Sequence, residues 1–217
     1  MQLTLDFPEG VPSFDLSEDE VETVIAVACQ GAREARTHVT PGQLEVPITI
    51  IVRKAMRRVK KELGLTNLEI QGERELENMA ANDSSLQGRI DIILKFRRQF
   101  GDEDDYVAME CKRVGAGGDY SQLNGRYVSE GVARFVSEQY AAGHVWGFML
   151  GYILALPVEK VVKTIDTRVC KDYGEDAKLS PRACHKDALA IQVGHLVQKS
   201  GHTIRLCHLF VDMTPAA

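Results

Sequence analysis

Two stretches with alternating apolar residues, Arg89 to Phe96 and Tyr106 to Val114, constrain the fold more than any other part of the chain. In each stretch the side chains follow the two-residue period of a β-strand with one strongly apolar face. Residues 101–105, with the sequence GDEDD, are typical of a polar turn or loop. We therefore expect the two strands to pair as an antiparallel hairpin, which fixes the charged side chains that face one another.

Three charged side chains share the second face of this expected hairpin. Asp91 lies on one strand, Glu110 and Lys112 lie on the other, and pairing brings Asp91 close to Glu110. Neighbouring carboxylates repel each other, and a divalent cation that prefers oxygen ligands, Mg²⁺ or Mn²⁺, relieves the repulsion most directly. A lysine beside them can hold a phosphate oxygen or orient a water. The alternative is that these charges lie on a solvated, exposed face. Ile93 and Ala108 argue against this alternative, because they are apolar residues placed among the charges.

At these residues the sequence resembles the PD-(D/E)XK, or restriction-endonuclease-like, nuclease superfamily. Asp91 followed by Glu110-Cys111-Lys112 on the next strand is similar to the family's D…E-x-K signature, although Ile90 stands in place of the proline. The resemblance covers about residues 42–154. It implies an α/β fold with an αβββαβ core, in which helices flank a mixed central sheet. An N-terminal helix and a C-terminal helix and strand would be additions to that core.

The resemblance also implies a metal site. Asp91, Glu110 and the main-chain carbonyl of Cys111 are the expected ligands of Mg²⁺, with Mn²⁺ as a substitute. Lys112 would position or deprotonate a water, or stabilise the transition state. The first core helix of the family often carries a further acidic residue that reaches the metal. Glu45 is the first candidate for this residue, and two acids remain as alternatives, Glu73 and Glu75.

Two amphipathic helices are expected before the hairpin. The capping-box pattern that begins at Ser17 predicts a helix to about Arg36. The second helix runs from about Glu45 or Pro47 to Leu63, and one side of it is strongly basic. That side is either a solvated face or a face that contacts phosphates. Its candidates for nucleic-acid contacts are Arg53, Arg57 and Lys60.

Further elements are expected on both sides of the hairpin. A short first strand includes Leu68 and Ile70, and a helix from about Tyr120 to Tyr140 places Arg134, the fourth candidate for nucleic-acid contact, toward the strand ends. The apolar run at 145–154 has the composition of a strand buried on both faces. A helix from Pro157 to about Gly174 and an added strand at 203–211 complete the prediction, whereas residues 175–200 have no clear pattern.

The chain of 217 residues is interpreted as three segments: an acidic N-terminal segment and helix at 1–40, a nuclease core at 41–156, and a helical and strand extension at 157–217 that packs on the core. No signal-peptide pattern opens the chain, and no apolar run reaches the ~18 residues of a membrane span. The five cysteines lack the spacing of a zinc ribbon or a disulfide framework. These features predict a cytoplasmic protein that does not bind membranes.

The expected function is that of a metal-dependent endonuclease, a hydrolase of phosphodiester bonds. DNA is the expected substrate, RNA remains open, and targeting would rely on a homodimer or a protein partner. Defence against foreign DNA is the biological role that accompanies such folds. The formal net charge of -5 leaves a second hypothesis open, a catalytically silent nucleic-acid-binding or assembly subunit with the same fold.

Overall fold

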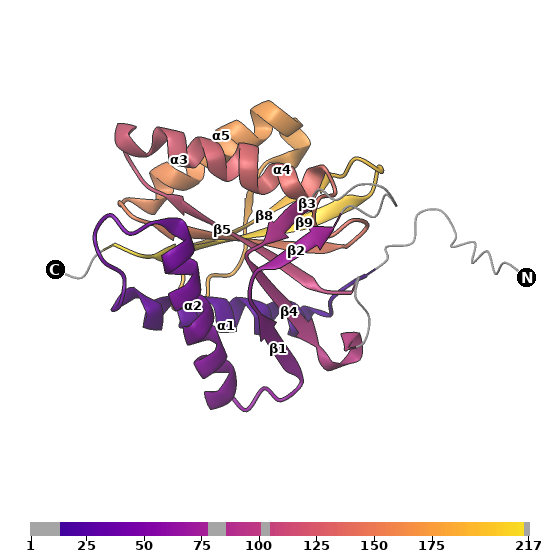
Figure 1. The fold of residues 1–217 in the computed structure, drawn as a ribbon. Coiled ribbons are helices and arrows are strands. Elements are labelled where there is room, and N and C mark those ends of the chain that lie inside the picture. Colours follow the sequence, from indigo (N-terminus) through magenta and orange to yellow (C-terminus); the bar gives the residue numbers. More distant parts are fainter. Residues whose placement is uncertain (1–13, 78–85, 101–104, 215–217) are drawn as a thin grey trace, which may run out of the picture.

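The computed structural model describes residues 14–77, 86–100 and 105–214 and contains a seven-stranded mixed β-sheet with helices on both faces (Figure 1). The strands β5, β6 and β9 are parallel to one another, and the other neighbouring strands are antiparallel. In spatial order the strands are β1 (Leu68–Gln71), β4 (Ile92–Phe96), β5 (Val107–Val114), β6 (Trp146–Ile153), β9 (Thr203–Asp212), β8 (Ala190–Val197) and β7 (Ser180–Pro181).

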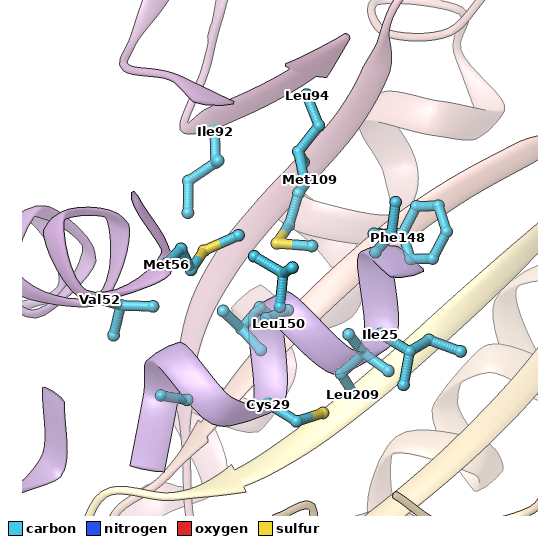
Figure 2. Packing of buried hydrophobic residues seen from close by; sticks show 14 of the residues in the cluster. Ile25, Cys29, Val52, Met56, Ile92, Leu94, Met109, Phe148, Leu150 and Leu209 are labelled. Carbon is cyan, nitrogen blue, oxygen red and sulfur yellow. The ribbon is translucent and has the colours of Figure 1, made fainter. Parts of the chain in front are cut away.

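One face of the sheet is covered by α1 (Glu18–Arg36) and α2 (Glu45–Glu62), as Figure 1 shows. The predicted capping box of α1 is confirmed, because the Ser17 hydroxyl accepts from the Glu20 amide and the Glu20 carboxylate accepts from the Ser17 amide. Apolar side chains from both helices pack against the sheet (Figure 2). The helices approach closely at Gly31, where an added Cβ would lie 2.8 Å from the main-chain nitrogen of Met56.

The other face is covered by α5 (Val158–Tyr173) and by one helical stretch between β5 and β6. That stretch changes geometry along its length, in the order η2 (Gly118–Tyr120), α3 (Ser121–Arg126), the π-helix η3 (Tyr127–Val132) and α4 (Ala133–Val136). The prediction of a helix to Tyr140 is therefore too long. The helix ends earlier because Glu138 has a left-handed backbone with φ of 62°, and the Tyr140 amide donates back to the Arg134 carbonyl.

The predicted single strand at 89–96 is wrong, because the chain bends at Asp91. Residues before the bend form β3 (Leu86–Ile90), which pairs with β2 (Arg74–Glu77) in a separate two-stranded ribbon. Residues after the bend form β4, which pairs antiparallel with β5 as the hairpin prediction requires. Ile90 and Ile92 consequently belong to the cores on opposite faces of the sheet. The bend frees the Asp91 carboxylate to reach β5.

The C-terminal third of the described chain continues the same sheet. The prediction of a buried strand at 145–154 is confirmed by β6, and every residue of β6 is buried. The predicted strand at 203–211 exists as β9, but it lies inside the sheet between β6 and β8. All of β8 lies in the region at 175–200 that has no clear sequence pattern, and η4 (Glu175–Ala177) also forms there. None of the helices in the described ranges is both long and apolar enough to traverse a bilayer.

Candidate functional site

Glu110 and Lys112 project from β5 toward the helical stretch between β5 and β6. The Glu110 side chain has no exposed surface, the Lys112 side chain is 9% exposed, and the Lys112 Nζ lies 2.6 Å from the Glu110 Oε1. The same ammonium lies 3.2 Å from the main-chain oxygen of Cys111. The exposed-face alternative is therefore wrong, because these charges are paired in the interior, where an unpaired charge would be strongly unfavourable.

Asp91 reaches the same strand from the bend between β3 and β4. Its Oδ2 accepts a hydrogen bond of 2.8 Å from the main-chain amide of Cys111, the residue between Glu110 and Lys112. This contact satisfies a β5 amide that the ladder with β4 does not use, since the β4–β5 register begins at Ile92. The structure thus brings Asp91 to the Glu110–Lys112 segment, as the sequence analysis expects.

Glu45 joins this group from the first residue of α2. Its Oε1 lies 3.1 Å from the Lys112 Nζ, and its Oε2 accepts from the Arg113 main-chain amide at 3.0 Å. A carboxylate in the first helical turn is also stabilised by the helix dipole. The two alternative acids belong to the two-stranded ribbon of β2 and β3 or to its approach. Glu73 pairs with Arg89 at 3.3 Å, and Glu75 is an exposed residue of β2.

Arg134, a predicted nucleic-acid contact, lies against Glu110. Its Nη1 donates to the Glu110 Oε1 and to the Tyr140 hydroxyl, at 2.7 Å in each case. The Arg134 side chain is 32% exposed, so it closes one side of the carboxylate site. Sequence reasoning missed Tyr140, which contributes a hydroxyl from the turn after α4.

The buried charges change one another's protonation. Burial raises the pKa of Glu110 to about 7, with a further contribution from the negative charge of Asp91. Burial likewise raises the pKa of Asp91, against the opposing effect of Lys112. Burial alone would lower the pKa of Lys112, but Glu110, Glu45 and Asp91 more than offset this and raise it. The acidic neighbours of Lys112 therefore stabilise its positive charge, which favours an electrostatic role for this side chain.

The carboxylate set fits a hard divalent cation in one specific respect. The Glu110 Oε2 is buried and finds no hydrogen-bond partner among the described residues. A buried carboxylate oxygen without a partner is unfavourable, and a cation with oxygen preference would satisfy it. Within residues 14–77, 86–100 and 105–214, no three histidine, cysteine or acidic side chains gather as a metal-holding group. The predicted ligand set has only two such side chains, Asp91 and Glu110, with the Cys111 carbonyl as its third member.

The site opens to solvent beside the start of α2. A pocket of about 270 Å³ is lined there by three basic and two acidic residues and by apolar side chains; the charged residues are Lys112, Arg113, Arg126, Glu45 and Glu130. Acidic side chains balance part of the positive charge of its wall, since Lys112 pairs with Glu45 at 3.1 Å and Arg126 pairs with Glu130 at 3.5 Å.

The other three candidates for nucleic-acid contact follow Glu45 along α2. With the α-helical rise of about 1.5 Å per residue, the distances from Glu45 along the helix axis are about 12 Å for Arg53, 18 Å for Arg57 and 22 Å for Lys60. The Arg57 Nε donates to the Ile70 carbonyl, and the guanidinium of Arg53 packs against the Gly72 backbone. Arg57 and Lys60 line a second pocket, of about 410 Å³, between α2 and β1. These two arginines thus have structural contacts, and the basic face leads away from the carboxylate site.

Comparisons of this chain with protein-family models, with curated proteins and with solved structures find no match.

Proposed function

We propose that this protein is a metal-dependent endonuclease that hydrolyses phosphodiester bonds of DNA. The proposal rests on one observation: Asp91, Glu110, Lys112 and Glu45 come together from a bend, a strand and a helix start. Beside these contacts, the buried Glu110 Oε2 has no hydrogen-bond partner in the described part of the chain. From α2 to β6, with the β2–β3 ribbon set aside, the elements follow the order helix, three strands, helix, strand. This order supports a restriction-endonuclease-like core.

Each residue of the site has a role that its surroundings support. Asp91 and Glu110, with the Cys111 carbonyl, would hold Mg²⁺ or Mn²⁺, because these are oxygen donors of the type that both ions prefer. When bound, such an ion supplies Lewis-acid activation of water and neutralises charge on a phosphate. Lys112 stays protonated and stabilises negative charge that develops on the scissile phosphate. Glu45 orients the Lys112 ammonium through the 3.1 Å contact.

The test is cleavage of supercoiled plasmid DNA with Mg²⁺ or Mn²⁺. We expect nicking by the wild type and a loss of about 10²-fold or more in Asp91→Asn, Glu110→Gln and Lys112→Met, because each change removes a ligand or the cation at the phosphate. Glu45→Gln should reduce the rate. The matched control is Glu62→Gln at the other end of the same helix, which should cleave like the wild type.

Two results would contradict the proposal. Cleavage that persists in all three site variants would place the chemistry elsewhere. A wild type that binds DNA without cleaving it, and that shows no Mn²⁺ binding dependent on Asp91 and Glu110 in calorimetric titration, would favour the silent nucleic-acid-binding subunit.

A further inference from the structure

The turn between α4 and β6 places a tyrosine hydroxyl between the two halves of the carboxylate site. Tyr140 is fully buried. Its hydroxyl accepts from Arg134, which also holds Glu110, and donates to the main-chain carbonyl of Arg89. Arg89 lies two residues before Asp91, next to the bend. Tyr140 therefore links the carboxylate on β5 to the bend that carries the second carboxylate.

The backbone of this turn is held in an unfavourable conformation. Glu138 and Ala141, on the two sides of Tyr140, have φ values of 62° and 51°. Residues with a Cβ rarely adopt this left-handed region, because the side chain crowds the backbone. Such conformations persist where surrounding contacts enforce them, and they concentrate at functional sites.

A buried glutamine enforces the conformation. The Gln198 side chain donates to the carbonyls of Phe135 and Ala141 and accepts from the amide of Gly143, at 2.9 to 3.0 Å. Gln198 is 2% exposed, so these bonds are shielded from water. One side-chain amide thus bonds to the end of α4 and to two residues of the turn that follows it.

We propose that Tyr140 and Arg134 are positioning residues that set the separation of the Asp91 and Glu110 carboxylates, and with it their affinity for Mg²⁺ or Mn²⁺. This inference rests on the proposed function, because it takes both carboxylates as ligands of a divalent cation. The reason is geometric, because a single atom, the Tyr140 hydroxyl oxygen, bonds to both sides of the site. It donates to the main chain before Asp91, and it accepts from the Arg134 guanidinium that contacts Glu110. Loss of the hydroxyl of a merely structural tyrosine would weaken metal binding no more than loss of any other buried tyrosine hydroxyl.

The experiment compares two variants that each remove one buried tyrosine hydroxyl. Tyr140→Phe keeps the ring and its packing, and the matched control Tyr127→Phe removes a hydroxyl that bonds to His208. We expect Tyr140→Phe to weaken Mn²⁺ binding about tenfold, as removal of a residue that orients a ligand does. Calorimetric titration measures this affinity. Exchange of the Cys111 amide, followed by NMR without metal, should become faster because its acceptor Asp91 is less well held. Tyr127→Phe should leave both measurements at wild-type values.

The possible results separate the two proposals. Wild-type affinity and wild-type Cys111 exchange in Tyr140→Phe overturn the positioning role and leave the proposed function standing. Equal weakening in both variants also overturns it, because general loosening of the fold would then be sufficient. No Mn²⁺ binding by the wild type overturns the proposed function and the inference together.

Discussion

At the scale of single residues, the most informative feature is the cation that the chain itself supplies. The Lys112 ammonium contacts oxygen atoms of Glu45, Glu110 and Cys111 at 2.6 to 3.2 Å. Two of these residues belong to the expected metal ligand set. Lys112 therefore balances the carboxylates, and under the proposed function a divalent ion would compete with it for Glu110 and for the Cys111 carbonyl.

This competition predicts an unusual phenotype for Lys112→Met. Without the ammonium the carboxylates repel one another, so the thermal midpoint in chelator should fall. The rise of the midpoint on addition of Mn²⁺ should be larger than in the wild type, because the ion no longer competes with the lysine. Lys95→Met, a change of another buried lysine on β4, is the control and should leave the Mn²⁺-induced rise unaltered. A smaller rise in Lys112→Met than in the wild type would contradict the competition.

Several of these residues are predictable from the sequence because local rules place them. The two-residue period places Glu110 and Lys112 on one face, and the helix start places Glu45 within reach. Tyr140 is different. Its position depends on left-handed backbone at Glu138 and Ala141, and neither residue type announces such a conformation.

At the scale of elements, the contact between α1 and α2 controls where the site's helix lies. A Cβ on Gly31 would come within 2.6 to 2.9 Å of Met56, and two of the three nearest atoms belong to its main chain. Rotation of the Met56 side chain would relieve only part of this overlap. The two helices must therefore separate when any larger residue replaces the glycine.

We expect Gly31→Ala to lower the free energy of unfolding by about 1–3 kcal/mol, although alanine is the better helix former. Chemical denaturation measures the change. Ala32→Gly, at the neighbouring buried position, removes a methyl group without forcing the helices apart and serves as the comparison. A Gly31→Ala variant that is more stable than the wild type would show that α1 and α2 tolerate a wider spacing.

The break between β3 and β4 is the feature that the sequence pattern predicts least well. Ile90, Ile92 and Leu94 keep the alternation of one continuous strand, yet the chain bends at Asp91. At this bend the Asp91 carboxylate accepts a long-range hydrogen bond from the Cys111 amide. A local pattern carries no information about a partner that is twenty residues away.

At the scale of the whole molecule, strand order is also beyond local patterns. The apolar composition of 145–154 is sufficient to predict a central strand, which is β6. β9 lies between β6 and β8 because it pairs with segments that are distant in the sequence. An alternating pattern can predict that a segment is a strand, but it does not predict the position of that strand in the sheet. The helices on both faces follow from their stripes of apolar residues.

Global stability should depend on pH through a buried histidine of β9. His208 bonds to the Tyr127 hydroxyl, and burial lowers the pKa of His208 to about 3. Between pH 6.5 and 3 the unfolded chain therefore binds more protons at this residue than the folded chain, and the free energy of unfolding falls as the pH falls. Stability from the neutral imidazole is fully present above about pH 6.5.

We expect the wild type to lose about 2–3 kcal/mol more than His208→Phe when the pH is lowered from 7 to 4.5, since phenylalanine does not titrate. Urea denaturation of both proteins at the two pH values gives the comparison. The ring of phenylalanine suits the site, because the His208 ring packs against the aromatic rings of Tyr127 and Phe210. Parallel pH dependence in the two proteins would mean that His208 accepts a proton in the folded state.

The glutamine that fixes the turn around Tyr140 has a consequence for the order of synthesis. Gln198 follows β8, whereas Asp91, Glu110 and Arg134 are all made earlier. A nascent chain on the ribosome thus carries both acidic groups before it carries the amide that holds Tyr140 in place. The late arrival of Gln198 separates the synthesis of the two carboxylates from the synthesis of the residue that holds the turn around Tyr140.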